Sequence, residues 1–375
     1  MPKILLLANA ASPWTRELIR NIHCPLGHRV ILASFDPAPE RDYEGLNTCF
    51  EPLAVNIKGP WGKVCKTVAL LRLALKYRRK VDMVVIHCPP NNVQALLISW
   101  AVRLMDSRTL TVFWGSDLQA VNDAQAGRLA HIVQCSDCVN ISTQEMRLAY
   151  NRFFGKQFSP KIYSAKFGSL AFSACDEAAS EYTKESSKSF FGLDPAKICV
   201  AVGYGGKPSH QHVSAIKALA RLTGEEKEKI QMLLHMHGGE RGYIEKVKSA
   251  ADEAGIGYVI LPGSYGLKEI AIMRMATDIF LHAQTNDAMS SSVRECLYSG
   301  AVLVNPSWIR YPEYQELGID YISYHDFSDL TAKMGELIRG ERKINVQRNR
   351  EIVREEYSWE AVKGEWVRIF DENIT

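Results

Sequence analysis

Apolar residues along this chain recur with the spacing of alternating strands and helices. The first apolar run, Lys3–Ala8, predicts a strand, and Ser12 with Pro13 opens a helix that runs to about Ile22. Arg29–Ala33 then predicts a second strand, so the chain opens with a strand, a helix and a strand. This order is typical of a parallel sheet covered by helices.

The same alternation continues to about residue 168 and predicts a doubly wound parallel sheet. Its later elements are predicted at Val81–His87, Val93–Met105 (a helix), Leu110–Phe113 and Cys138–Ile141. A polar stretch over Ser173–Ser189 shows no apolar stripe, and we interpret it as a connection. A second series of strands is predicted at Ile198–Val202, Ile230–His235, Gly257–Leu261, Asp278–Leu281 and Ala301–Val304.

The two series predict an α/β protein with two Rossmann-like domains that face each other across a cleft. A chain of 375 residues is long enough for two such domains. We assign residues 1–170 to an N-terminal domain, 171–356 to a C-terminal domain, and 357–375 to an aromatic-rich amphipathic helix. A cleft between domains is a usual place for a ligand.

Composition places the chain among soluble globular proteins, with 46% hydrophobic and 23% charged residues. No apolar run reaches the roughly 18 residues of a transmembrane helix, and the N-terminal run is too short for a signal peptide. The nine cysteines are scattered and odd in number. They favour reduced thiols in a cytoplasmic protein over a disulfide framework.

Charge is unevenly divided between the two halves of the chain. Residues 1–170 hold 21 Lys and Arg against 12 Asp and Glu, whereas the remainder holds 24 against 30. Residues 63–80 predict a basic amphipathic helix whose apolar stripe consists of Val64, Val68, Leu71 and Leu75. The helix fits either a core position with a solvated face or peripheral contact with the anionic inner face of the cytoplasmic membrane.

The stretch Ala283–Asn305 carries the strongest site signal. It predicts a loop with Asp287, a helix with Glu295 and a strand. The helix start is marked by three consecutive hydroxyl residues, Ser290, Ser291 and Ser292. Free N–H groups at a helix start suit a diphosphate, and two carboxylates eight residues apart can meet the hydroxyls of one ligand. We interpret this stretch as the anchor for a nucleotide-sugar donor.

A glycine-rich turn follows the first strand of the second series. Gly203, Gly205 and Gly206 let a backbone approach a phosphate closely, and Lys207 follows them. The turn equally fits a purely structural role. Pro208 occupies the third glycine position of a dinucleotide fingerprint, which disfavours an NAD-dependent dehydrogenase.

His210 and His212 follow this turn at the predicted start of a helix. Their spacing places them on different faces, which argues against a shared metal, and His210 is a candidate to face the donor. The sequence contains neither a D-x-D pair nor an H-E-x-x-H motif. We therefore predict no metal site and no cofactor.

His87 and Asp117 each end a strand of the first predicted sheet. The carboxyl ends of parallel strands point toward the ligand crevice, so either residue could act as a general base for an acceptor hydroxyl. Neighbouring Trp114 could raise the pKa of the Asp117 carboxyl. The alternatives are a satisfied buried histidine for His87 and a helix cap for Asp117.

This order of parts resembles a glycosyltransferase of the GT-B fold. The stretch with Asp287 and Glu295 is similar to the E-x7-E region of glycosyltransferase family 4, which implies that Glu295 binds the donor ribose. The stretch LPGSYGLKEI resembles the loop beside the nucleotide base and implies that role for Tyr265. The end YSWEAV resembles the helix that crosses back to the first domain.

Two other stretches, WGSDL and VGYGGKPSHQHVSAIKAL, resemble the bacterial 4-acetamido-4,6-dideoxygalactose transferases of family 56. Family 4 retains and family 56 inverts the sugar configuration, so the resemblance leaves the stereochemistry open. The family-56 pattern has Asp in place of Lys207, Asn in place of His210, and no Glu in place of Glu295.

The resemblance implies transfer of a sugar from a nucleotide diphosphate sugar to a lipid-linked or polysaccharide acceptor, as in O-antigen or capsule synthesis. The first domain would bind the acceptor and the second the donor. Lys207 or Arg294 would neutralise leaving-group charge without a metal. Two other functions stay open, namely a sugar-nucleotide epimerase of the same fold and a non-catalytic sugar-nucleotide-binding protein.

Overall fold

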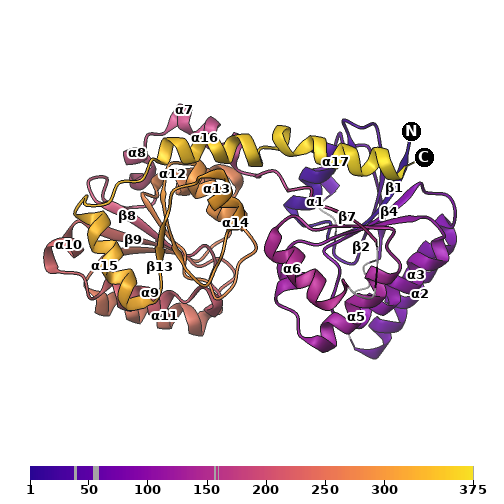
Figure 1. The fold of residues 1–375 in the computed structure, drawn as a ribbon, viewed down its shortest axis with the longest axis horizontal. Helices are drawn as coiled ribbons and strands as arrows, with labels where there is room; N and C mark the ends of the chain where they lie inside the picture. Colours follow the sequence, from indigo (N-terminus) through magenta and orange to yellow (C-terminus); the bar gives the residue numbers. More distant parts are fainter. Residues whose placement is uncertain (38–39, 54–58, 156–157, 159, 375) are drawn as a thin grey trace. The chain divides into compact units, whose positions relative to one another are not determined.

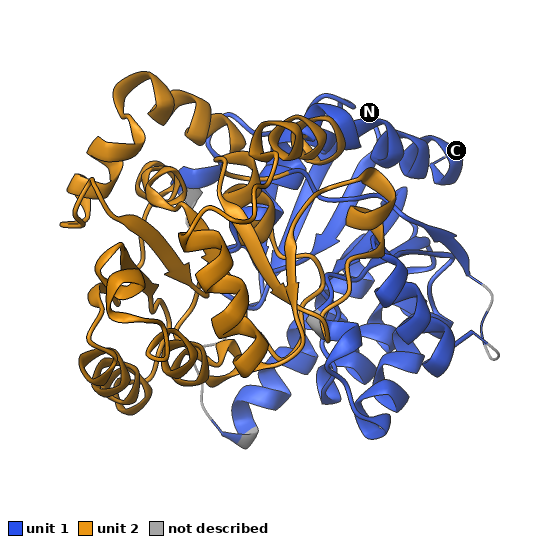
Figure 2. Ribbon diagram, turned by 60° about the vertical axis from the view of Figure 1, so that its left-hand side comes forward, with its two compact units in different colours: residues 1–168, 359–375 blue, residues 169–358 orange. Residues whose placement is uncertain are grey.

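The computed structural model describes residues 1–37, 40–53, 59–155, 158 and 160–374. The chain divides into two compact units, coloured blue and orange in Figure 2. Unit 1 comprises residues 1–168 and 359–375, and unit 2 comprises residues 169–358. Each unit is built on one parallel sheet (Figure 1). No helix in the described ranges combines the length and apolar character needed to cross a bilayer.

Unit 1 contains a seven-stranded sheet in the order β3-β2-β1-β4-β5-β6-β7. Its strands are β1 (Lys3–Leu7), β2 (Arg29–Ser34), β3 (Thr48–Pro52), β4 (Met83–His87), β5 (Arg108–Val112), β6 (Cys138–Asn140) and β7 (Lys161–Tyr163). Its helices are α1 (Pro13–Leu18), η1 (Ile19–His23), η2 (Glu40–Tyr43), α2 (Pro60–Tyr77), α3 (Val93–Met105), α4 (Ser116–Gln119), α5 (Asp123–Gln134), α6 (Gln144–Phe153) and α17 (Trp359–Asn373).

Helices cover both faces of this sheet. One core cluster packs α2, α3 and α5 on one face, and another packs α1, η1 and α17 on the other. In α17 the side chain of Trp366 is fully buried, and its indole N–H donates to the carbonyl of Lys166 at 2.8 Å. The last helix of the chain is therefore part of the core of unit 1.

Unit 2 contains a six-stranded sheet in the order β10-β9-β8-β11-β12-β13. Its strands are β8 (Ile198–Val202), β9 (Ile230–His235), β10 (Gly257–Leu261), β11 (Ile279–Leu281), β12 (Val302–Pro306) and β13 (Ile322–Tyr324). Its helices are α7 (Phe172–Glu181), α8 (Lys184–Phe190), η3 (Pro208–His210), α9 (His212–Leu219), α10 (Gly224–Glu228), α11 (Arg241–Ala254), α12 (Leu267–Ala276), α13 (Ser291–Tyr298), α14 (Pro312–Leu317), α15 (Phe327–Ile338) and α16 (Val346–Tyr357).

The predicted α/β class with two Rossmann-like sheets is confirmed. The sequence did not predict β3, β7 or β13. Strand β3 lies at a sheet edge with partly exposed side chains, and β7 and β13 have three residues each. Short edge strands bury few apolar side chains, so their sequences lack the continuous apolar run of a central strand.

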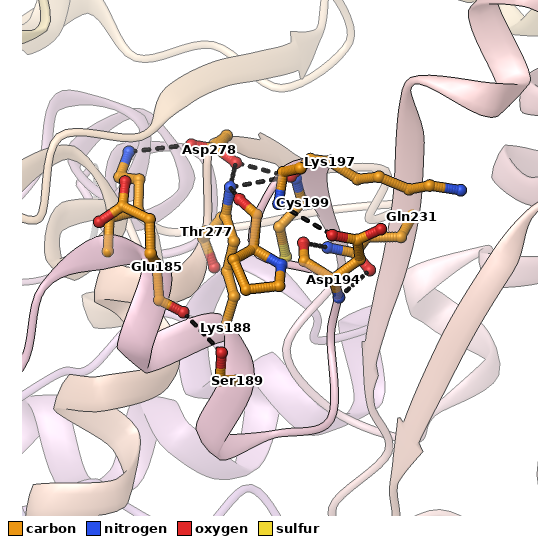
Figure 3. A network of polar contacts seen from close by, with 12 residues as sticks. Glu185, Lys188, Ser189, Asp194, Lys197, Cys199, Gln231, Thr277 and Asp278 are labelled. Carbon is orange, nitrogen blue, oxygen red and sulfur yellow. Dashed lines mark hydrogen bonds and ion pairs between the residues drawn. The ribbon is translucent and has the colours of Figure 1, made fainter.

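The interpretation of Ser173–Ser189 as a connection was wrong, because the stretch folds into most of α7 and α8. Both helices pack on α12. The buried ammonium of Lys188 contacts the carboxylate of Asp278 at 2.7 Å and the carbonyl of Lys197 at 2.8 Å (Figure 3). The same carboxylate accepts the N–H of Cys199 at 2.9 Å. A buried lysine thus fixes α8 to the sheet, and apolar spacing cannot reveal such a contact.

Candidate functional site

The strand order of unit 2 reverses between β8 and β11, which are neighbours in the sheet. In doubly wound folds, ligands bind at such a switch point, beyond the carboxyl ends of the strands. The loop after β8 holds residues 203–211, and the loop after β11 holds Asp287 and leads into α13. The fold therefore gathers most of the predicted donor residues at the switch point of one sheet.

Gly206 is required by packing inside unit 2. A Cβ at this position would lie 2.4 Å from the Cα of Gly239 and 2.5 Å from the carbonyl oxygen of Met236. The loop after β8 therefore touches the loop after β9, backbone against backbone. The sequence analysis gave no role to the loop after β9. Its glycine pair, which includes Gly239, is the sequence feature that could have indicated a close backbone contact.

Gly203 and Gly205 lie against buried histidine rings. Gly203 has a φ of +66°, and a Cβ there would lie 2.9 Å from Nε2 of His212. A Cβ at Gly205 would lie 3.3 Å from Nε2 of His210. Lys207, in contrast, is exposed beyond the glycines. The glycines thus shape the loop, and Lys207 is the loop side chain that is free to meet an anion.

The prediction that His210 and His212 face apart was wrong. Gln211 adopts a left-handed φ of 53° and separates η3 from α9, so the two rings stack with centroids 5.5 Å apart. Burial lowers the pKa of His210 to about 3 and that of His212 to about 4. Both rings are therefore neutral near pH 7. Among the described residues, no three His, Cys, Asp or Glu side chains are placed to share a metal ion.

Asp287 is held by three donors in the loop before α13. Its carboxylate accepts the hydroxyl of Tyr311 at 2.6 Å, the hydroxyl of Tyr204 at 3.2 Å and the backbone N–H of Ser290 at 2.8 Å. Tyr204 comes from the loop after β8, so Asp287 ties the two switch-point loops together. Neither tyrosine was singled out from the sequence, because each looks like an ordinary core aromatic there.

Helix α13 begins where its hydroxyl residues predicted. Ser290 is the N-cap residue, and Ser291 and Ser292 form the first turn. The first N–H groups of a helix have no partner within the helix, so this end is suited to an anion. Gly300 follows the helix with a φ of +83°, the left-handed conformation in which glycine commonly ends a helix.

Glu295 has internal partners on both carboxylate oxygens. One oxygen accepts the hydroxyl of Ser291 at 2.6 Å, and the other contacts Nε of Arg274 at 3.2 Å. Glu295 is only 5% exposed and Arg274 only 4%. A second guanidinium nitrogen of Arg274 donates to Ser292 at 2.9 Å. The Arg274–Glu295 pair stabilises the first turn of α13 from the buried side. The sequence analysis did not identify Arg274, because nothing in its local sequence indicates that it is buried.

Two further predicted donor residues, Arg294 and Tyr265, come from α13 and from the loop after β10. The guanidinium of Arg294 is 5.1 Å from the ring centroid of Tyr357, and the arginine is buried. Tyr265 packs edge-on against the ring of His235, with centroids 5.7 Å apart. His235 ends β9, so Tyr265 does lie at the carboxyl edge of the sheet.

Asp117 caps a turn in unit 1. Its carboxylate accepts the backbone N–H of Trp114 at 3.0 Å and that of Gly115 at 2.7 Å. The side chain is buried, and burial raises the pKa of the Asp117 carboxyl to about 6. Asp117 lies within α4 and accepts from residues that precede it, so it does not cap the residues that follow, as the alternative supposed. The pKa of its carboxyl still allows a carboxylate near pH 7.

His87 ends β4 and lies in an aromatic cluster. Its ring is 4.7 Å from that of Trp114 and 5.5 Å from that of Phe167, centroid to centroid. Burial lowers the pKa of His87 to about 3. The residue also lines a pocket of about 140 Å³ beyond β1 and β4, where the strand order of this sheet reverses. Apart from His87, Cys88 and Gln94, the lining residues of the pocket are apolar.

The sequence matches no protein-family model, and no curated protein matches it. Solved structures do match it. HepE from Anabaena in complex with UDP and glucose has a TM-score of 0.73 and 14% identity, with 99% of this chain and 100% of that chain covered. A glycosyltransferase from Rickettsia africae has a TM-score of 0.76 and 14% identity, with 100% of this chain and 99% of that chain covered. Sucrose-phosphate synthase from Thermosynechococcus elongatus has a TM-score of 0.74 and 12% identity, with 99% of each chain covered.

At these identities the likeness establishes the fold. The fold class is that of two α/β domains with one parallel sheet each, and the similar solved structures are glycosyltransferases of the GT-B fold. The similarity spans both units, because nearly all of each chain is covered.

Proposed function

We propose that this protein is a glycosyltransferase that moves a sugar from a nucleotide diphosphate sugar to a lipid-linked or polysaccharide acceptor in bacterial cell-surface glycan synthesis. The observation that supports it most is the switch point of unit 2. There Lys207, the helix start at Ser291 and the carboxylate of Asp287 follow two adjacent strands. The fold neighbour HepE has been solved in complex with UDP-glucose, which makes a UDP-sugar the first donor to test.

In this proposal the N–H groups at Ser291 and Ser292 hold the diphosphate, and Lys207 neutralises leaving-group charge. The N–H of Ser290 is donated to Asp287 and orders the loop in front of them. Asp287 and Glu295 belong to the donor site, as in the family 4 resemblance. The internal partners of Glu295 favour a positioning role for it, because a ligand would have to displace Ser291 or Arg274. Tyr265 is proposed to lie beside the base. The protein is proposed to be cytoplasmic, which agrees with nine free cysteines.

The acceptor is proposed to bind in unit 1, near His87 and Asp117. The largely apolar pocket beside His87 suits an apolar part of an acceptor. If the reaction inverts, Asp117 is the proposed base. Because the pKa of its carboxyl is about 6, kcat/KM should fall as pH falls through 6. Asp117→Asn should abolish turnover while donor binding by unit 2 persists.

Thermal unfolding with UDP-, GDP- and dTDP-sugars tests the donor site. A bound donor should stabilise the protein by about 2.7 kcal/mol at a hundredfold excess over Kd. Lys207→Ala should weaken the donor roughly tenfold, because it removes a charge from the diphosphate. Lys229→Ala is the matched control. Lys229 is exposed and lies just before β9, at the amino ends of the strands and therefore away from the donor loops.

If no nucleotide sugar raises the unfolding temperature, the donor site is refuted. Product analysis with donor alone separates the remaining functions. A new sugar nucleotide formed without acceptor would indicate an epimerase, and donor binding without turnover on any acceptor would indicate a binding protein.

A further inference from the structure

The apolar stripe of α2 faces solvent. Val64, Val68 and Leu75, predicted on one stripe, are 51%, 39% and 55% exposed, and Trp61 extends the stripe at 73%. The opposite face of the helix is also apolar and is the one that packs in the core, through Leu70, Leu73 and Ala74. Helix α2 thus has two apolar faces, and the sheet of unit 1 uses only one.

Helix α3 repeats this arrangement beside α2. Val93, Leu96 and Trp100 recur with helical spacing and are 61%, 38% and 54% exposed. Its buried face, which includes Ile98 and Val102, joins the same core cluster as the buried face of α2. The two helices pack side by side on one face of the sheet, as Figure 1 also shows. Their exposed stripes therefore point the same way, away from the sheet.

The charged residues of the two helices are all positive. Neither helix sequence contains Asp or Glu, whereas α2 contains four basic residues, Lys63, Lys66, Arg72 and Lys76. Within the described ranges, no carboxylate pairs with Lys63 or Arg72. Lys76 is paired with Glu51 of β3. Exposed apolar side chains with two tryptophans, surrounded by unpaired basic residues, suit the boundary between lipid headgroups and acyl chains.

We propose that the exposed stripes of α2 and α3 form one docking surface for an anionic lipid bilayer, with Trp61 and Trp100 inserted at the headgroup level. A second copy of this chain is disfavoured as the occupant, because a symmetric contact would oppose the same basic residues to each other. The surface lies on the membrane and does not cross it, because the other face of each helix is held in the core. The inference concerns unit 1 and holds whether or not the chain transfers a sugar.

Vesicle sedimentation of the full chain tests the surface. The wild type should co-sediment with phosphatidylcholine vesicles that contain about one-third phosphatidylglycerol, and much less with phosphatidylcholine alone. The double variant Trp61→Ala/Trp100→Ala should bind the anionic vesicles at least about tenfold more weakly. Lys63→Glu/Arg72→Glu should lose the preference for anionic lipid. Raising the salt to about 1 M, where the Debye length is about 3 Å, should weaken wild-type binding.

Leu148→Ala is the matched control, because Leu148 is 63% exposed on α6 of the same unit but lies outside the surface. It should bind vesicles like the wild type. The proposal is overturned if the wild type binds neither vesicle, if the tryptophan variant binds as well as Leu148→Ala, or if analytical ultracentrifugation shows a dimer that only the tryptophan variant loses. Unfolding temperatures with and without nucleotide sugar verify that each variant is folded, and they report on donor binding separately.

Discussion

At the scale of single residues, the buried ion pair of Arg274 and Glu295 is the feature that most changes the interpretation of the site. The carboxylate that was expected to bind the donor forms an ion pair with a guanidinium inside the unit. Two charges this deeply buried are tolerated because they pair with each other and each also forms a hydrogen bond with a serine hydroxyl. Their joint role is to fix the first turn of α13.

Glu295→Ala should therefore destabilise the protein itself. Removing one partner of a buried pair leaves an uncompensated charge, which costs about 3–5 kcal/mol. Urea unfolding of unit 2 should show this loss, and Glu295→Gln should show less of it because an amide oxygen can still accept from Ser291 or Arg274. Glu316→Ala, at an exposed position on α14, is a comparison in the same unit. A fully stable Glu295→Ala would show that the pair does not hold α13 in place.

At the scale of elements, the loops at the carboxyl edge of unit 2 are shaped by their contacts with each other. The loop after β8 meets the loop after β9 at Gly206 and Gly239, and it meets the loop after β11 through Tyr204 and Asp287. Each loop is thus positioned by a neighbour far away in the sequence. The site depends on the mutual fit of three loops rather than on one motif.

Gly206→Ala should disturb this fit. Its Cβ would be 2.4 Å from backbone atoms that cannot rotate away, so we expect about 1–3 kcal/mol of destabilisation and weaker donor binding. Gly242→Ala in α11 is the control, because its Cβ would meet no atom within 4 Å. That change should be neutral or stabilise the helix by about 0.5–1 kcal/mol. Chemical denaturation and nucleotide titration measure both variants, and equal behaviour of the two would contradict the close loop contact.

At the scale of the whole molecule, buried histidines govern the response to acid. Burial lowers the pKa of the ring from 6.5 to about 3 or 4 in five cases, namely His23, His87, His210, His212 and His235. Above pH 6.5 these rings are neutral in both the folded and the unfolded state. Below it, the unfolded chain binds protons that the folded chain does not, so stability is lost as pH falls toward 4.

At pH 5 each of these histidines should cost about 2 kcal/mol, or about 10 kcal/mol in all. Asp117 acts in the opposite direction, because its raised pKa lets the folded state bind a proton, and it restores about 1–2 kcal/mol at that pH. We expect a steep fall in the unfolding temperature between pH 6.5 and 5, measured by circular dichroism. His212→Asn should flatten this fall and exposed His131→Asn should not. A flat profile for the wild type would refute the assignment of neutral buried rings.

Much of the fold could be predicted from the sequence, because central strands and amphipathic helices mark themselves locally. The helix Val93–Met105 has the bounds predicted for it, and α13 starts at its hydroxyl residues. The candidate site was predicted less completely. The contributions of Arg274 and Tyr204 depend on contacts with segments that are distant in the sequence. The local sequence around each of them looks like that of an ordinary core position.

The sequence by itself determined the fold class, the two series of strands and the neighbourhood of Asp287, because each follows from the order of apolar runs and turn residues. The tertiary structure decided which face of each element is used. It turned the stripe of α2 toward solvent and the carboxylate of Glu295 toward Arg274. Helical spacing shows that residues share a face, but only the packing of neighbouring elements decides whether that face meets the core, a ligand or a membrane.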